Sequence, residues 1–347
     1  MFTRLAKGFR GAATATAFAV AAGFAAQTAT AAELIFNNYA PPPSPVTKVL
    51  FEQFAADIEA ATNGEVTVTI PATSMAPVNG NWELVTNGIV DVVNQAAYVM
   101  PQQFKLQRLA ELPFNTLSAE AASVALNRTY DKYFAESGEY DGVKVLAFTV
   151  FAGRQIMNNV RPIETIEDYA GLKIWTTPGP LAAAADALGA TAVPAPFPKL
   201  FEFASKGTVD GMMYTPSTAR SSQTGDYVQY YTHIPGGLGS ISFAMVMNQD
   251  SWDRLSPEHQ EAIQTLADDL PSKYGKVQDG DEESALGMIG VETLDASPEL
   301  VAAIEERLAG FEAGWIETAK GAGIENPQEV LDYYREQMEL AADAATN

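Results

Sequence analysis

Two stretches of this chain repeat one local pattern, in which a helix ends at a glycine and an aspartate three residues later introduces a strand. Residues 85–95 are VTNGIVDVVNQ, and residues 204–214 are ASKGTVDGMMY. Each copy lies in an alternation of short strand-like and helical segments, which is typical of an α/β domain with a largely parallel sheet. Because the copies lie in different halves of the chain, the sequence predicts two similar lobes. We interpret Asp91 and Asp210 as structural residues that hold these turns.

Hydrophobic periodicity and turn residues place the other elements. Strands are expected within residues 32–44, 65–70, 81–99, 140–154, 171–180, 190–197, 199–216 and 240–248. Helices are expected within residues 45–64, 181–189, 256–270 and 297–319, and at the starts of 81–99 and 199–216. The amphipathic helices after residue 256 suggest elements that cross between the lobes. The acidic run at residues 278–284 lacks the ligand spacing of a calcium loop, so we expect a solvated helix face there.

The first residues have the features of a secretory signal and not of a folded domain. Arg4, Lys7 and Arg10 precede an apolar, alanine-rich segment, and the small residues 29–31 suit a cleavage site. No second long apolar run follows. We therefore expect a signal peptide at residues 1–31 and an exported, soluble mature chain.

The composition excludes several kinds of function. The 347 residues include no cysteine, which removes thiolate metal sites, cysteine nucleophiles and disulfides. The net charge of −22 disfavours nucleic acids and anionic membranes as partners, so an anionic ligand would need a local cation. There are two histidines and none of the common catalytic or nucleotide-binding motifs. An exported, two-lobed α/β protein of this kind is typical of solute-binding proteins, whose lobes close on a ligand.

Longer motifs connect the chain to a known family. NVRPIETIEDYAGLKIWTTPG occupies residues 159–179, and LGATAVPAPFPKLFEFASKGTVDGMMYTP occupies residues 188–216. PPPSPVTKVLFEQFAADIEAATNGEVTV at residues 41–68, VTNGIVDVV and the ELPF of residues 111–114 fit the same pattern. Over essentially the whole mature chain, the sequence resembles the substrate-binding subunits of TRAP (tripartite ATP-independent periplasmic) transporters of the DctP type.

The resemblance implies a fold and a division into lobes. The implied fold is α/β and two-lobed, of the periplasmic-binding-protein kind (type II-like), with the ligand cleft between the lobes. By this analogy, residues 32–151 and 240–279 form lobe one. Residues 152–239 and 280–347 form lobe two, with long C-terminal helices that cross between the lobes.

The resemblance also implies a function. It predicts a periplasmic receptor that captures a small organic acid by hinge closure and delivers it to TRAP membrane permease subunits. It does not predict an enzyme. No cofactor or metal is expected, and the C-terminus shows no extra helix for dimer formation, so we expect a monomer. Two other functions stay open at this point, namely a receptor that hands its closed form to a signalling partner, and a secreted hydrolase.

Two positions of the family motifs concern the ligand. The arginine that closes the family motif GLKIR usually pairs with the ligand carboxylate, but here that position is Trp175. A second family arginine, in FAGRQIMNN, is present as Arg154. Three alternatives follow. An organic anion could be held by Arg154 while Trp175 stacks on its apolar body, a zwitterionic or quaternary ammonium solute could rest on Trp175 by a cation–π contact, or Trp175 could be packing in a site for a neutral solute.

The other expected ligand-binding residues lie at strand ends and lobe corners. As a set they would form an aromatic-lined cleft with few charges, which suits a monocarboxylate with a flat or apolar body. These residues are Asn38, Tyr39, Trp82, Asn94, Tyr98, Thr176, Tyr214, Thr215 and Phe243.

Overall fold

The computed structural model describes residues 32–38 and 45–346 of the chain. The expected signal peptide and Tyr39 lie outside the described residues. None of the helices in the described ranges combines the length and the apolar character that a membrane span requires.

The first of two sheets contains five strands in the order β2-β1-β3-β10-β4. Strand β1 pairs in parallel with β2 and β3, and β10 returns antiparallel between β3 and β4. The strands span Ala32–Asn37 (β1), Val66–Thr69 (β2), Val92–Ala96 (β3), Val143–Val150 (β4) and Ser242–Asn248 (β10).

The second sheet contains six strands in the order β11-β9-β5-β8-β6-β7. Its parallel part, β7-β6-β8, was expected from the sequence, whereas β5, β9 and β11 were not. These three strands have four residues each and little alternation, so their hydrogen-bonding partners define them. The strands span Gln155–Asn158 (β5), Lys173–Thr176 (β6), Thr191–Pro194 (β7), Gly211–Tyr214 (β8), Tyr230–His233 (β9) and Glu292–Asp295 (β11).

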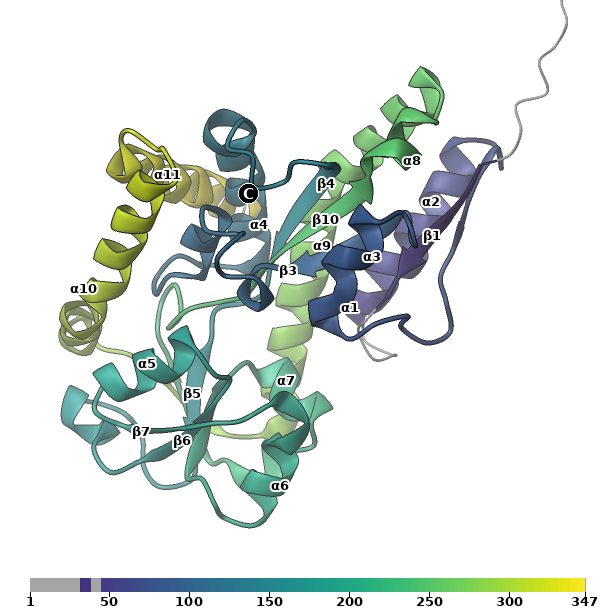
Figure 1. Cartoon of the computed structure of the whole chain (residues 1–347). Helices are drawn as coiled ribbons and strands as arrows, with labels where there is room; N and C mark the ends of the chain where they lie inside the picture. The colour runs from purple at the N-terminus through teal and green to yellow at the C-terminus, as the bar shows by residue number, and fades with distance from the viewer. Residues whose placement is uncertain (1–31, 39–44, 347) are drawn as a thin grey trace, which may run out of the picture. The chain divides into compact units, whose positions relative to one another are not determined.

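Helices cover both faces of each sheet (Figure 1). On the first sheet, α4 and α11 pack on one face, and α2 and α9 pack on the other. On the second sheet, α5 and α10 cover one face, and α6 and α7 cover the other. The helices span Pro45–Thr47 (α1), Phe54–Ala61 (α2), Asn81–Thr86 (α3), Ala119–Thr129 (α4), Pro180–Ala187 (α5), Leu200–Ser205 (α6), Pro216–Ser221 (α7), Gln249–Asp253 (α8), Pro257–Ile289 (α9), Pro298–Gly321 (α10) and Pro327–Thr346 (α11). The two-lobed α/β fold predicted from the sequence is confirmed.

The repeated corner has the same hydrogen bonds in both sheets, which confirms that the two copies are equivalent. The Asp91 N–H donates to the carbonyl of Ile35 at 2.9 Å, and the Ile35 N–H donates back to the Asp91 carboxylate at 2.7 Å. Asp210 makes the same pair of bonds with Lys173, at 2.7 and 2.8 Å. The glycine before each corner has φ of 65°, which is the left-handed conformation that a helix C-terminus requires.

Two segments cross side by side between the sheets, at residues 151–154 and 236–241. The backbone N–H of Arg154 donates to the carbonyl of Gly239, and the N–H of Leu238 donates to the backbone carbonyl of Arg154, both at 2.8 Å. The strand expected at residues 140–154 is therefore wrong at its end, because β4 stops at Val150 and the chain leaves the first sheet. A Cβ atom on Gly237 would lie 2.6 Å from the Cα of Gly153, so this close backbone approach requires glycine.

Helix α9 runs past both sheets and holds a helix on each (Figure 1). The Asp279 carboxylate accepts hydrogen bonds from the N–H groups of Ala119 and Glu120, at 2.7 and 3.0 Å, at the start of α4. The Glu282 carboxylate accepts one from the Ser217 N–H at 2.7 Å, at the start of α7. The expectation of a solvated helix face is wrong for Asp279 and Glu282, because these carboxylates satisfy the free N–H groups of two other helices.

The capping role of Glu282 predicts a pH effect on stability. Burial raises the pKa of Glu282 above its ordinary value of 4.5, and the hydrogen bonds from Ser217 and Thr215 and the positive charge of Arg154 only partly offset this. Because the folded chain holds this proton more tightly than the unfolded chain, the contribution is fully present below pH 4.5 and is lost as pH rises through the raised pKa. The free energy of unfolding of the wild type should therefore increase, relative to that of Glu282→Gln, as pH falls from neutral. Denaturant unfolding of both proteins across this pH range checks this. A constant difference would contradict it.

Candidate ligand-binding site

The central feature of the site is a buried arginine that forms no direct ion pair with any described residue. Arg154 lies on the first crossing segment and is only 1% exposed. Within the described part of the chain, its Nε and Nη1 atoms have no hydrogen-bond partner, and no carboxylate oxygen lies within 4.0 Å of it. Burying a cation without a partner costs roughly several kcal/mol of folding free energy. Such a group therefore indicates a binding place for an anion from outside the chain.

Aromatic rings surround this guanidinium group. Its Cζ atom lies 4.2 Å from the ring centre of Tyr214 and 5.8 Å from that of Phe151. The ring centre of Phe151 lies 5.3 Å from that of Phe243, and that of Tyr214 lies 5.5 Å from that of Trp175. Since Phe243 belongs to the first sheet and Tyr214 to the second, the two sheets both contribute to the surroundings of Arg154.

Trp175 is completely buried on β6, and the face of its ring is tilted by 47° against Tyr214. It pairs in register with Met212 of the neighbouring strand and packs in the same core cluster. Its Nε1 atom has no hydrogen-bond partner among the described residues, and neither has the hydroxyl of the next residue, Thr176. Trp175 therefore offers an N–H donor in addition to its apolar surface.

Asn94 and Phe243 come from neighbouring strands of the first sheet. Asn94 on β3 pairs with Met245 on β10, so Asn94 lies on the same face of the sheet as Met245 and Phe243. Asn94 is 2% exposed, and its Oδ1 atom has no partner within the described residues. The first sheet therefore contributes a buried hydrogen-bond acceptor, Asn94 Oδ1, whereas the second sheet contributes a buried donor, Trp175 Nε1.

Tyr98 follows β3 and is 41% exposed. The pKa of Tyr98 is raised, first because its hydroxyl group is partly removed from water and then because Tyr214 lies near it, while Arg154 lowers it. These couplings place Tyr98 near the Arg154 group.

Other expected residues have different surroundings. The hydroxyl of Thr215 lies 3.2 Å from that of Ser217 and 3.0 Å from that of Thr218, at the start of α7. Trp82 packs against Phe104, with ring centres 5.0 Å apart, in the core on the other face of the first sheet. Asn38 directly follows β1 and is partly buried. The structure thus brings Arg154, Trp175, Tyr214, Tyr98 and Phe243 toward one region, with Asn94 on the sheet face of Phe243, and leaves Trp82 in a separate cluster. Thr176 follows Trp175 on β6, so its side chain points to the opposite face of that sheet.

Sequence reasoning missed two aromatic neighbours of Arg154. Phe151 lies in the crossing segment, whereas its sequence pattern predicts a place in a buried strand. Tyr274 lies on α9, and its ring centre is 6.2 Å from that of Phe151. It is completely buried, and its hydroxyl has no partner within the described ranges. Its spacing from the buried residues Ile263, Ala267 and Leu270 follows an ordinary helix core face, so no signal in the sequence separates it from core.

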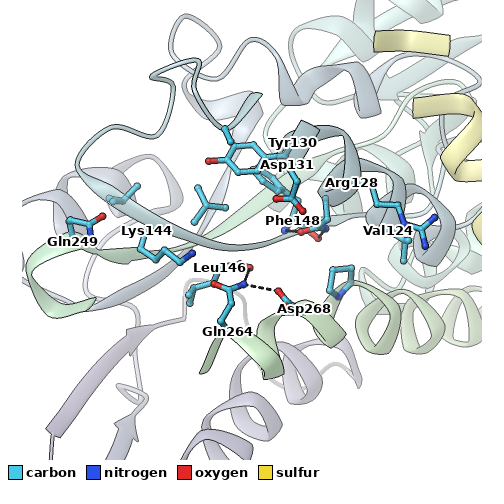
Figure 2. A pocket seen from close by; sticks show the side chains of 15 residues that line it. Val124, Arg128, Tyr130, Asp131, Lys144, Leu146, Phe148, Gln249, Gln264 and Asp268 are labelled. Atoms are coloured by element: carbon cyan, nitrogen blue, oxygen red, sulfur yellow. Dashed lines mark hydrogen bonds between the residues drawn. The ribbon is translucent and has the colours of Figure 1, made fainter. Parts of the chain in front are cut away.

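A cavity of about 550 Å³ lies elsewhere, between α4, β4 and α9 (Figure 2). Burial lowers the pKa of Lys144 in its wall, although Asp268 and Asp131 oppose that shift. In the wall of this cavity, the positive charge of Lys144 is therefore balanced by the negative charges of Asp131 and Asp268. None of the expected ligand-binding residues lines the cavity. In residues 32–38 and 45–346, no group of three or more histidine and acidic side chains is arranged to hold a metal ion.

The fold and this site define a protein with two α/β lobes and a buried arginine between aromatic rings, with no ion-pair partner within 4.0 Å among the described residues. The model of the bacterial extracellular solute-binding protein family 7, DctP, matches residues 36–309, and the chain belongs to this family. It is a periplasmic solute receptor of the TRAP type and not an enzyme.

Individual proteins show the same relationship. The chain is 31% identical over 308 residues to the outer membrane transporter protein TsaT of Comamonas testosteroni, covering 88% of this chain and 91% of that protein. A TRAP periplasmic solute-binding protein from Bordetella bronchiseptica, with bound (R)- and (S)-mandelate, has 29% identity and a TM-score of 0.80, covering 89% and 99%. A marine metagenome TRAP solute-binding protein specific for aromatic acid ligands, in complex with 3-hydroxybenzoate, has 27% identity and a TM-score of 0.78, covering 89% and 98%.

Proposed function

We propose that this receptor binds an aromatic monocarboxylate between its lobes and delivers it to the TRAP membrane permease. The observation that carries the proposal is the buried Arg154, whose Nε and Nη1 atoms have no partner among the described residues. A planar guanidinium group can donate two parallel hydrogen bonds to one carboxylate, which suits a ligand with a single acid group. The N–H of Trp175 adds a third donor without adding a second charge.

The surroundings of Arg154 favour an anion over a cationic solute. The face of Tyr214 is already covered by the guanidinium group at 4.2 Å, and Trp175 is tilted against the same ring. A quaternary ammonium group on Trp175 would therefore lie near the buried positive charge of Arg154, and the two like charges would repel each other. This argues against the cation–π alternative.

The aromatic body of the ligand is supported by the residues on both sides of the arginine. Phe151, Phe243, Tyr214 and Trp175 provide ring surfaces within one connected group of contacts. Flat ligands pack well on such rings. The relatives that carry mandelate and 3-hydroxybenzoate support the same class of ligand.

We propose that binding closes the lobes about the two crossing segments and the associated part of α9. Lobe one is then residues 32–151 and 240–279, and lobe two is residues 152–239 and 280–347. The last helix, α11, is an exception to this division, because its buried face packs against α4 in the core of the first sheet. We propose that the receptor works as a monomer.

A thermal-shift screen of the mature chain, confirmed by calorimetric titration, tests the proposed function. The library contains aliphatic acids, aromatic acids, sulfonates and quaternary ammonium zwitterions. A ligand at about 100 times its dissociation constant stabilises the folded chain by about 2.7 kcal/mol, which raises the melting temperature measurably. We expect aromatic monocarboxylates to give the largest shifts. Shifts only with zwitterions or only with aliphatic acids would contradict the proposal.

A further inference from the structure

We propose that the ligand carries a hydroxyl group in addition to its carboxylate, and that Asn94, Thr149 and Tyr274 form the subsite that binds this hydroxyl group. The inference rests on the proposed function and narrows its ligands to hydroxylated aromatic monocarboxylates. It assigns a role to Thr149 and Tyr274, which no sequence motif indicated.

The three residues share one face of the first sheet. Asn94 pairs with Met245, and Thr149 pairs with Phe243, on the two sides of β10. Paired residues point to the same side of a sheet, as do residues two apart on one strand. Asn94 and Thr149 therefore lie on the face that carries Phe243 and Met245. Tyr274 packs in the core cluster of this same face, together with Met245.

Each of the three has a buried polar atom without a partner in the described part of the chain. These atoms are Asn94 Oδ1, Thr149 Oγ1 and the Tyr274 hydroxyl, and the residues are 2%, 1% and 0% exposed. Buried polar groups are nearly always hydrogen-bonded, so three on one sheet face indicate a missing polar partner. A carboxylate cannot be that partner for Asn94 Oδ1, because an ionised carboxylate only accepts hydrogen bonds.

A hydroxyl group can bind the acceptor of Asn94 and one of the two donors at the same time. It donates one hydrogen bond, which the Asn94 oxygen can accept, and its oxygen can accept a hydrogen bond from Tyr274 or Thr149. Burial raises the pKa of Tyr274 well above its usual value, so this phenol keeps its proton and remains a donor.

The ring of Phe151 lies between Tyr274 of the subsite and Arg154, which binds the carboxylate in the proposed function. The centre of Phe151 lies 6.2 Å from the ring centre of Tyr274 and 5.8 Å from Arg154 Cζ. An acid group and a hydroxyl group on one aromatic framework could therefore reach both places at once. A site built to bind a hydroxyl group discriminates against the analogue that lacks it, because its own polar groups are then left unpaired.

Calorimetric titration of the mature chain with two matched pairs of acids tests the inference. The pairs are benzoate with 3-hydroxybenzoate, and phenylacetate with mandelate. We expect the hydroxylated member of at least one pair to bind about tenfold to a hundredfold more tightly than its partner. In Tyr274→Phe and in Asn94→Leu, this ratio should fall to about threefold or less, mainly through weaker binding of the hydroxylated acid.

Tyr334→Phe is the matched control. Tyr334 is also completely buried, but its hydroxyl donates to the carbonyl of Asn115 at 2.8 Å in the other core of the first sheet. This variant should lose stability and keep the wild-type ratio. Equal affinities within both pairs for the wild type, or an unchanged ratio in both site variants, would overturn the hydroxyl subsite and leave the proposed function intact. Absence of binding by all four acids would overturn both.

Discussion

Arg154→Ala is expected to weaken binding of an aromatic carboxylate by roughly 2–5 kcal/mol, which removes most measurable affinity. The side chain is buried, and the described residues provide no carboxylate partner for it, so a ligand acid group would be its counter-ion. The ligand-free variant should be as stable as the wild type or more stable, because a buried charge without a direct ion-pair partner among the described residues has been removed. Calorimetric titration with mandelate or 3-hydroxybenzoate, together with thermal unfolding without ligand, measures both effects.

Arg161→Ala is a suitable comparison for this variant. Arg161 lies only seven residues after Arg154, but its guanidinium group donates to the carbonyls of Asp168 and Ala170, at 2.9 and 2.7 Å. It should lose some stability and keep its affinity. Unchanged affinity in Arg154→Ala, or an equal loss in both variants, would refute the assignment of Arg154 as the anion anchor.

Gly275→Ala is expected to cost about 3 kcal/mol or more of unfolding free energy. A Cβ atom at this position would lie 2.1 Å from the Cα of Glu120 and 2.4 Å from its backbone nitrogen. Both are backbone atoms of α4, so no side chain can move aside, and α9 would have to separate from α4. That shift would also weaken the bonds from Asp279 to the start of α4. Denaturant unfolding monitored by circular dichroism measures the loss.

Gly280→Ala on the same helix provides the control. Nothing lies within 4 Å of a Cβ atom at Gly280, so alanine should stabilise the helix there by roughly 0.5–1 kcal/mol. The two substitutions are chemically identical and differ only in their surroundings. A similar effect of both on stability would show that the contact between α9 and α4 does not limit what position 275 accepts.

Local patterns predicted much of the fold. The corners at Asp91 and Asp210 were expected to be structural and equivalent, and each makes the same two hydrogen bonds to a neighbouring strand. The parallel part of the second sheet was also expected. These predictions succeed because side-chain periodicity, a helix-ending glycine and a following aspartate act over only a few residues. The resemblance to a known family then identified Arg154 and the unusual Trp175.

Other features depended on contacts between distant segments. Strands β5, β9 and β11 are defined by their partners and not by their own four residues. The acidic run on α9 predicts a solvated face because its sequence does not show that the starts of α4 and α7 contact it. Tyr274 follows an ordinary helix spacing and could not be separated from core by pattern alone.

The sequence by itself determined the class of elements, their repeat, the export signal that we expect and the family. Only the tertiary structure decided which buried polar atoms have partners, and that property selects the candidate site. Arg154, Trp175 and Asn94 come from segments up to 81 residues apart, between positions 94 and 175. Whether each finds a hydrogen-bond partner depends on which other segments pack against it, and this long-range packing is not encoded in any local spacing.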